Sequence, residues 1–212
     1  MLAVALVLAY LIGSAPTAYL VGRLKGIDVR KVGSGNMGAT NVYRTLGAWP
    51  GAIVLAIDAA KGVAAALLPR WLGLTEPDAW GLLLGLVAML GHARPIFLGF
   101  SSGGKGVATA GGIFGTLVPL AAAAGFAAFL IVVAVTRYVS LGSLVAAITL
   151  AVAVAVTRGV MSAPFLAALA VAIFVIWGHR SNIARLRRGE ERRLGRPGKQ
   201  GQSAAGPTEA RP

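Results

Sequence analysis

Three polar segments interrupt an otherwise apolar sequence and carry the residue types that bind phosphate. The first runs from Gly33 to Arg44. Its glycines permit positive φ, and successive backbone N–H groups form anion-binding nests. The segment predicts an anion site, with a polar turn that caps a helix as the alternative. Its candidate substrate-binding residues are Ser34, Asn36, Gly38, Thr40, Asn41 and Arg44, of which Arg44 adds a planar fork suited to phosphate.

The second segment begins at Gly99 and precedes an apolar stretch. Phosphate often binds at a helix N-terminus. Gly99, Gly104 and Lys105 fit the spacing of a nucleotide-binding P-loop, but Gly106 stands where the magnesium-binding Ser or Thr would be, and no strand precedes it. We therefore reject a nucleotide triphosphatase and predict a phosphate cradle, with a Gly-rich reverse turn as the alternative. The candidate binding residues are Gly103, Gly104, Lys105 and Thr109.

The third segment follows the last apolar block and runs from His179 to Glu190. Its arginines would suffice to fix the orientation of a membrane span. That role does not require His179, Asn182 or Glu190, so these three are candidate site residues.

Two charges lie inside an apolar block. Asp58 and Lys61 are spaced i,i+3, so they can pair on one helix face. Charges at the centre of a membrane helix are costly, and a self-neutralising pair that supports the bundle is favoured over direct catalysis. We place His92, near the end of the next block, in the same supporting group.

Several chemistries are excluded by what the sequence lacks. It contains no cysteine, which excludes disulfides, thiolate metal sites and thiol catalysis. Its two histidines are too few for a histidine-rich metal site, and neither has the Asp five positions later that many acyltransferases use in a general-base pair. We predict no metal and no cofactor.

The composition predicts an all-α polytopic membrane protein. Of 212 residues, 57% are hydrophobic and 13% are charged, against about 25% charged in soluble domains. The apolar blocks approach the roughly 20 residues that cross a bilayer as a helix. We expect spans near 2–22, 50–68, 79–97, 107–118, 119–136, 139–156 and 161–178.

The net charge of +13 could indicate nucleic acid. Because the basic residues flank apolar blocks, we instead expect contact with anionic lipids and predict no nucleic-acid partner. The positive-inside rule places the N-terminus outside, and the first loop and the C-terminus in the cytoplasm. The second glycine-rich segment and the C-terminus then lie on the same side only if an even number of spans separates them. This requires Pro119 to divide the apolar block 107–136 into two short helices. We therefore predict seven helices, with five or six as alternatives. Residues 1–190 would form one domain and residues 191–212 a disordered basic tail.

Taken together, these segments resemble the bacterial membrane glycerol-3-phosphate acyltransferases that use acyl phosphate, the PlsY family. The resemblance rests on S-G-N-x-G-A-T-N-x-x-R from Ser34, D-x-x-K-G from Asp58, G-H-x-x-P from Gly91, G-G-K-G-V-A-T from Gly103 and the H-x-x-N segment from His179. It implies transfer of an acyl group from acyl phosphate to the 1-hydroxyl of sn-glycerol 3-phosphate, giving lysophosphatidic acid and phosphate. It also implies a multi-pass protein of the bacterial inner membrane, with its site facing the cytoplasm and a functional link to an enzyme that makes acyl phosphate.

On this hypothesis the first segment and the Gly103–Lys105 backbone hold the acyl phosphate, with Ser34 and Lys105 in the catalytic set. Arg44 and Lys105 attract glycerol phosphate. His179 and Asn182 orient the donor or stabilise charge on its carbonyl oxygen. The base is either a donor phosphate oxygen or His179. The rival classes are a transporter for an anionic metabolite and a non-catalytic protein that binds anionic lipid.

Overall fold

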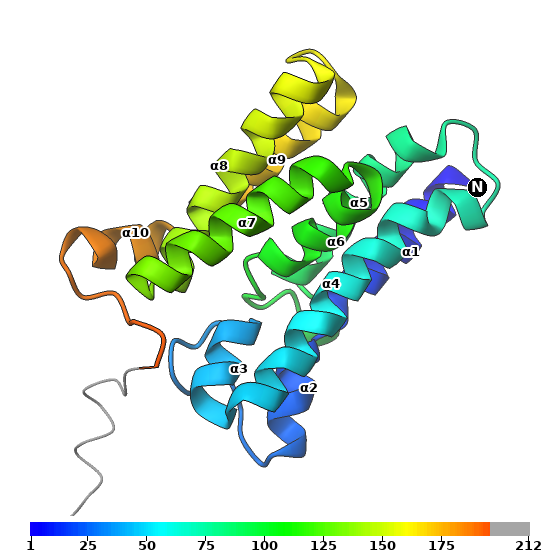
Figure 1. Ribbon diagram of the computed structural model, residues 1–212. Helices are drawn as coiled ribbons and strands as arrows, with labels where there is room; N and C mark the ends of the chain where they lie inside the picture. The colour runs from blue at the N-terminus through cyan, green and yellow to red at the C-terminus, as the bar shows by residue number, and fades with distance from the viewer. Residues whose placement is uncertain (196–212) are drawn as a thin grey trace, which may run out of the picture.

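The computed structural model describes residues 1–195, which form helices joined by loops and contain no strand (Figure 1). The helices are α1 (Leu2–Ser14), α2 (Thr17–Leu24), α3 (Ala39–Leu46), α4 (Ala48–Trp71), α5 (Pro77–Ala93), the 3-10 turn η1 (Ile96–Leu98), α6 (Val107–Leu117), α7 (Pro119–Thr136), α8 (Val139–Arg158), α9 (Ala163–Gly178) and α10 (Arg180–Arg187). The all-α prediction is confirmed. Residues 196–212, most of the predicted tail, lie outside the described residues.

Prolines stand at several of the helix boundaries. Pro16 lies between α1 and α2 and has no N–H to continue the helix. Pro119 begins α7 two residues after α6 ends, so the long block does contain the predicted break. Pro77 stands in the first turn of α5, where proline is favoured. Ser162 caps α9 by accepting a hydrogen bond from the backbone N–H of Phe165 at 3.3 Å.

The number of membrane spans is only partly resolved by helix length. Five helical segments of the described chain are long and apolar enough to cross a bilayer, and α9 with α10 makes a sixth if this pair, bent by 59°, is one broken span. The helix α6 has 11 residues, which is short for a crossing. Each of the seven predicted segments contains a helix, but seven crossings stay a prediction. The five segments are 2–24, 48–71, 77–98, 119–136 and 139–158.

The helices form two groups that meet at α6 (Figure 1). In the first group α5 packs against α1 and α4, and in the second α8 packs against α7 and α9. The helix α6 contacts α4, α5 and α7. The short helices α2, α3 and α10 lie toward one end, while the N-terminus lies at the other, beside the α4–α5 turn. The polar segments of the sequence are therefore gathered at one end of the bundle.

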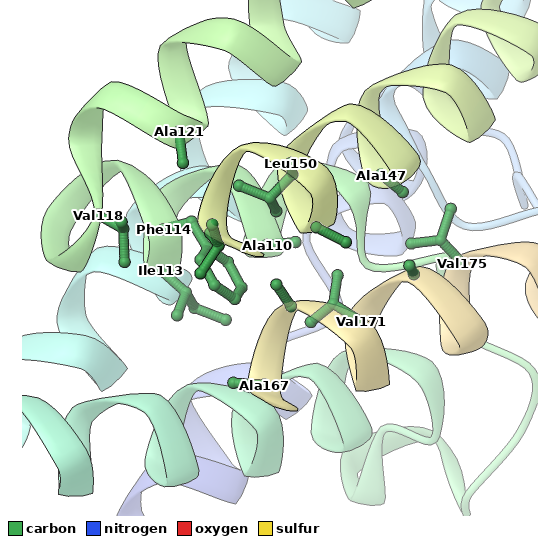
Figure 2. Packing of buried hydrophobic residues seen from close by; sticks show 14 of the residues in the cluster. Ala110, Ile113, Phe114, Val118, Ala121, Ala147, Leu150, Ala167, Val171 and Val175 are labelled. Atoms are coloured by element: carbon green, nitrogen blue, oxygen red, sulfur yellow. The ribbon is translucent and has the colours of Figure 1, made fainter. Parts of the chain in front are cut away.

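The largest buried cluster joins these groups. Phe114 and Ile113 of α6 face Leu150 of α8 and Val171 of α9 (Figure 2). Phe114 is fully buried. Alanines and valines supply much of the remaining contact, as expected where helices approach closely in lipid. This cluster fixes α6, whose N-terminus follows the second glycine-rich segment.

Two glycines bring the backbones of α4 and α6 into contact. A Cβ on Gly112 would overlap the carbonyl oxygen of Ala59, and a Cβ on Gly62 would overlap that of Thr109. The contact therefore has room for hydrogen only. By contrast, a Cβ on Gly111, the neighbouring residue of α6, would meet no atom within 4 Å.

We expect Gly112→Ala to destabilise the fold by about 1–3 kcal/mol, the usual cost of overpacking. Gly111→Ala should be neutral or stabilising, because alanine is favoured over glycine in helices by roughly 0.5–1 kcal/mol. Thermal unfolding in one detergent compares the two variants. Equal unfolding midpoints would contradict the close contact.

Candidate active site

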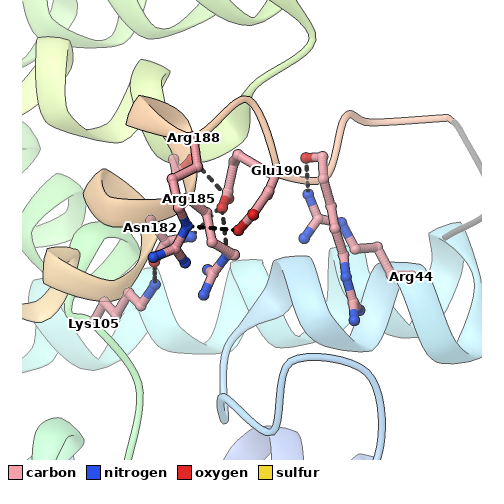
Figure 3. Close-up of polar contacts among 9 residues, drawn as sticks. Arg44, Lys105, Asn182, Arg185, Arg188 and Glu190 are labelled. Carbon is pink, nitrogen blue, oxygen red and sulfur yellow. Dashed lines mark hydrogen bonds and ion pairs between the residues drawn. The ribbon is translucent and has the colours of Figure 1, made fainter. Parts of the chain in front are cut away.

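A chain of hydrogen bonds joins the second and third polar segments. Lys105 follows the Gly103–Gly104 turn, and its ammonium donates to the Oδ1 atom of Asn182. The Nδ2 atom of Asn182 in turn donates to Oε1 of Glu191 at 2.7 Å. Figure 3 shows Lys105 reaching toward Asn182 from the loop below α10. The structure thus brings together two residues that lie 77 positions apart.

Glu191 is the carboxylate at the centre of this site. It is 7% exposed and accepts hydrogen bonds from Ser140 Oγ at 2.9 Å, from Asn182 and from Arg185 Nε at 2.8 Å. Burial alone would raise the pKa of the Glu191 carboxyl, but the hydrogen bonds from Asn182, Arg185 and Ser140 outweigh it and hold the pKa below its usual value. Glu191 is therefore ionised at neutral pH.

Arg44 enters the same site from α3. Its Nη2 atom donates to the carbonyl oxygen of Arg192 at 2.8 Å, and its buried Nε atom has no partner within residues 1–195 (Figure 3). Burial lowers the pKa of Arg44 and nearby Glu191 opposes that shift. An arginine remains charged under all ordinary conditions. Its Nε–H is a donor available to an anion.

The site has an excess of positive charge. Burial, together with repulsion from Arg185 and Arg44, lowers the pKa of Lys105 to about 8, while Glu191 acts in the opposite direction. At pH 7 the lysine is still mostly protonated. Three cations (Arg44, Lys105, Arg185) and one carboxylate then give a local charge of +2, which matches a phosphate dianion.

His179 lies at the bend between α9 and α10. It is 4% exposed, and its Nδ1 atom is 2.7 Å from the carbonyl oxygen of Val175. A carbonyl can only accept, so Nδ1 carries the proton of this hydrogen bond. In the neutral ring Nε2 is then the acceptor. The stem of Lys105 packs beside Gly178, so the histidine and the lysine belong to one site.

Asn41 organises the first glycine-rich segment. Its Oδ1 atom accepts from the backbone N–H of Ser34 at 2.8 Å, and its Nδ2 atom donates to the carbonyls of Val29 at 3.0 Å and Val32 at 3.2 Å. The side chain is 2% exposed. Its hydrogen bonds are thus used within the loop, which indicates that Asn41 positions this segment, while its contact with substrate stays a prediction.

The two glycine-rich segments meet at one end of the bundle. A Cβ on Gly104 would lie against the carbonyl oxygen of Met37, and both segments line a small pocket. Ser34 is exposed in the loop, and its hydroxyl accepts a long hydrogen bond, 3.4 Å, from the backbone N–H of Asn36. Gly38 precedes α3 and Thr40 lies in the first turn of this helix, where backbone N–H groups point out of the N-terminus and have no acceptor within the helix. The two segments can therefore bind parts of one substrate pair.

Two predicted binding residues lie elsewhere. Glu190 is exposed and pairs with Arg188 at 2.8 Å on the surface, one position before the buried Glu191 (Figure 3). Thr109 is fully buried on the face of α6 that packs against α4. The structure thus places Glu191, and not Glu190, in the hydrogen-bond chain with Asn182, one residue past the predicted domain boundary at 190.

The predicted supporting residues come together beneath the second segment. Lys61 Nζ is 2.6 Å from Asp58 Oδ1, and both side chains are buried. The Nδ1 atom of His92 is 3.8 Å from the same oxygen. Within residues 1–195 no three His, Cys, Asp or Glu side chains gather in a way that could hold a metal ion.

The fold and site define a helical membrane protein with a site of net positive charge at one end of the bundle. The family model described as glycerol-3-phosphate acyltransferase matches residues 3–189. The chain belongs to that family and is an acyltransferase.

Individual relatives agree. Glycerol-3-phosphate acyltransferase of Geobacter sulfurreducens is 47% identical over 186 residues, covering 88% of this chain and 94% of the relative. Glycerol-3-phosphate acyltransferase 1 of Deinococcus radiodurans is 44% identical over 191 residues, covering 90% and 94%. The crystal structure of PlsY, an integral membrane glycerol 3-phosphate acyltransferase, in its glycerol 3-phosphate form superposes with a TM-score of 0.84 at 37% identity, covering 92% of this chain and 96% of that one. The resemblance to the PlsY family is thereby confirmed.

Proposed function

We propose that this protein transfers a fatty acyl group from acyl phosphate to the 1-hydroxyl of sn-glycerol 3-phosphate, giving lysophosphatidic acid and phosphate. This reaction would be the first acylation of phospholipid synthesis. The observation that carries the proposal is the cluster of partly buried Arg44, Lys105 and Arg185 around the buried Glu191, with its local charge of +2. Both substrates carry a phosphate that such a cluster would bind.

The substrates divide between the segments. Arg44 and Lys105 bind the phosphate of the acceptor. Ser34, Asn36 and the Gly103–Lys105 backbone hold the donor phosphate, with Thr40 and Gly38 at the N-terminus of α3. In the reaction the acceptor oxygen bonds to the acyl carbonyl carbon, the bond from that carbon to the phosphate oxygen breaks, and the hydroxyl proton passes to the departing phosphate, either directly or through His179. Asn182 donates to the carbonyl oxygen as charge develops there.

The acyl-phosphate donor suits the available chemistry. Phosphate is a good leaving group, so no strong acid is required. The sequence has no cysteine to carry an acyl thioester and no His–Asp pair at the usual acyltransferase spacing. A fatty chain can remain between helices in the lipid, where its burial stabilises by about 0.8 kcal/mol per CH₂.

The site is proposed to face the cytoplasm of the bacterial inner membrane. Of the 20 basic residues, nine follow His179, and five more lie in residues 23–49 with one acid. The described parts of these regions, residues 23–49 and 180–195, lie at the end of the bundle that carries the site, which agrees with the positive-inside rule for a cytoplasmic face. An enzyme that makes acyl phosphate is the implied functional partner.

The decisive experiment uses purified protein in detergent with labelled glycerol 3-phosphate and either acyl phosphate or acyl-CoA. Lysophosphatidic acid from acyl phosphate alone is the expected result. Product from acyl-CoA alone would overturn the donor assignment, and no product from either would overturn the function.

His179→Ala tests which group takes the proton. If His179 is the base, turnover should fall by about 10²–10⁴ and the pH profile should change. If a donor phosphate oxygen is the base, a still-active variant should keep the wild-type profile. Burial lowers the pKa of His179 to about 4, so turnover numbers measured from pH 3 to 9 separate the two cases.

The pKa of Lys105 predicts an alkaline limit of activity. The lysine is charged below its pKa of about 8 and neutral above it, so binding of the acceptor phosphate should weaken as the pH rises through 8. Because kcat/KM reports the free enzyme, its alkaline limb should lie near pH 8. Lys105→Arg, which stays charged, should lose this limb even if its activity is lower, and a limb that persists in this variant would assign the titration to another group.

A further inference from the structure

Two charged side chains are buried in α4 at a distance from the basic site. The side chains of Asp58 and Lys61 are 3% and 5% exposed. A buried charge is costly unless it is paired and hydrogen-bonded. An apolar pair of similar size would fill the same space in the bundle. The two charges are therefore expected to bind other polar groups of the protein and to fix their positions.

Lys61 holds the break between α1 and α2. Its Nζ atom donates to the carbonyl oxygen of Ala15 at 2.5 Å as well as to Asp58. Ala15 is followed by Pro16, where the helix is interrupted, and its carbonyl oxygen accepts from the backbone N–H of Thr17 at 3.0 Å instead of from a donor one helical turn on. The chain that leaves this break leads through α2 to the first glycine-rich segment.

His92 connects the ion pair to the second segment. Its ring lies 3.8 Å from Asp58 on one side and contacts Gly104 on the other, where a Cβ would overlap it. Its carbonyl oxygen accepts from the backbone N–H of Gly104 at 3.2 Å, and the carbonyl of Ala93 accepts from Gly103 at 2.9 Å. The Gly103–Gly104 turn, which precedes Lys105, therefore packs against His92 and is hydrogen-bonded to its backbone.

We infer that Asp58, Lys61 and His92 form a positioning network, which fixes the Gly103–Gly104 turn and the α1–α2 break so that Lys105 meets Asn182. The inference rests on the proposed function, in which Lys105 binds the acceptor phosphate. The three residues act through the two glycine-rich segments and are not catalytic residues. Pro16, Met37 and Gly103 line the small pocket where the network meets both segments.

The double variant Asp58→Leu/Lys61→Met tests this role, because it removes both charges together. Such apolar replacement of a buried pair is often neutral or stabilising, so a purely structural pair could be replaced without loss. We expect a folded protein whose kcat/KM falls on the order of 10²-fold, as for a reactive group displaced by about 1 Å. The matched control is Arg70→Met/Asp78→Leu, which removes an exposed pair at the other end of α4.

The pH profile gives a second readout. Lys105 is surrounded by Glu191, Arg185 and Arg44, with His179 nearby. A lysine displaced from this site into water regains an ordinary pKa, so the alkaline limb should move above pH 8 in the double variant. A folded double variant with wild-type kcat/KM and an unchanged limb would overturn the inference. An inactive wild-type protein would instead overturn the proposed function.

A second cycle keeps the test decisive if the double variant does not fold. Gly104→Ala should reduce activity because its Cβ overlaps the His92 ring. His92→Ala/Gly104→Ala removes the overlap and should recover part of that loss, the signature of two coupled residues. Failure to recover any activity would overturn the seating of the turn on His92.

Discussion

Lys105→Ala should lower kcat/KM for glycerol 3-phosphate by about 10²–10³, the usual loss when one preorganised donor to a developing or bound anion is removed. The variant loses the ammonium that bonds to Asn182, and it reduces the local charge from +2 to +1. The KM for glycerol 3-phosphate should rise and kcat should fall, because the same charge also attracts this substrate. Steady-state kinetics over a range of glycerol 3-phosphate concentrations measure both.

Lys25→Ala is the matched control. Lys25 is an exposed lysine of the first loop and contributes to the same overall charge. If the basic surface merely attracted anions, the two variants would lose similar amounts of activity. A Lys105→Ala protein with kinetics like those of Lys25→Ala would remove Lys105 from the site.

Glu191→Ala should disable the enzyme and weaken the fold. Without this carboxylate, Asn182, Arg185 and Ser140 lose an acceptor, and Arg44, Arg185 and Lys105 repel one another without compensation. Removing one partner of a buried charge pair costs about 3–5 kcal/mol, although Arg185 is one-third exposed and solvent reduces its share. We expect loss of activity together with a lower unfolding midpoint.

The neighbouring residue supplies the control for Glu191. Glu190→Ala removes an exposed carboxylate whose pair with Arg188 should contribute roughly 0–1 kcal/mol, so activity and unfolding midpoint should stay near wild type. Lowering the pH should destabilise the fold in the same way as Glu191→Ala, because protonation removes the charge of Glu191. The lowered pKa of Glu191 stabilises the fold above the ordinary carboxyl pKa, and this contribution is lost as the pH falls through the lowered value. Equal effects of the two alanine variants would contradict the central place of Glu191.

The sequence indicated the fold well because membrane helices leave strong local signals. Apolar blocks and proline positions are local, and the break at Pro119 is found where it was predicted. The number of crossings was less accessible, since α6 is apolar but short. Whether a short helix crosses depends on its neighbours and on the lipid rather than on its own residues.

The site was predicted less completely, because its details depend on contacts between distant segments. Lys105 and Asn182 were found from their motifs, and the structure joins them. Asn41 has the composition of a binding residue, yet its amide is used within its own loop. Of the adjacent Glu190 and Glu191, only the second returns toward Ser140, 51 positions earlier in the chain. Residue type alone does not show which of two adjacent glutamates enters the site, because that depends on how the distant segments pack.

The short length of α6 affects how a water-soluble acceptor and a lipid-soluble donor can reach the same site. Eleven residues rise only about 16 Å, roughly half the thickness of a hydrocarbon layer of about 30 Å. A helix of that length leaves at least one of its ends below headgroup level unless the bilayer is thinned around it. On the proposed function, a recessed polar end of α6 would let glycerol 3-phosphate reach the site from water while the fatty chain of the donor stays among the lipids, so that neither substrate has to leave its own medium.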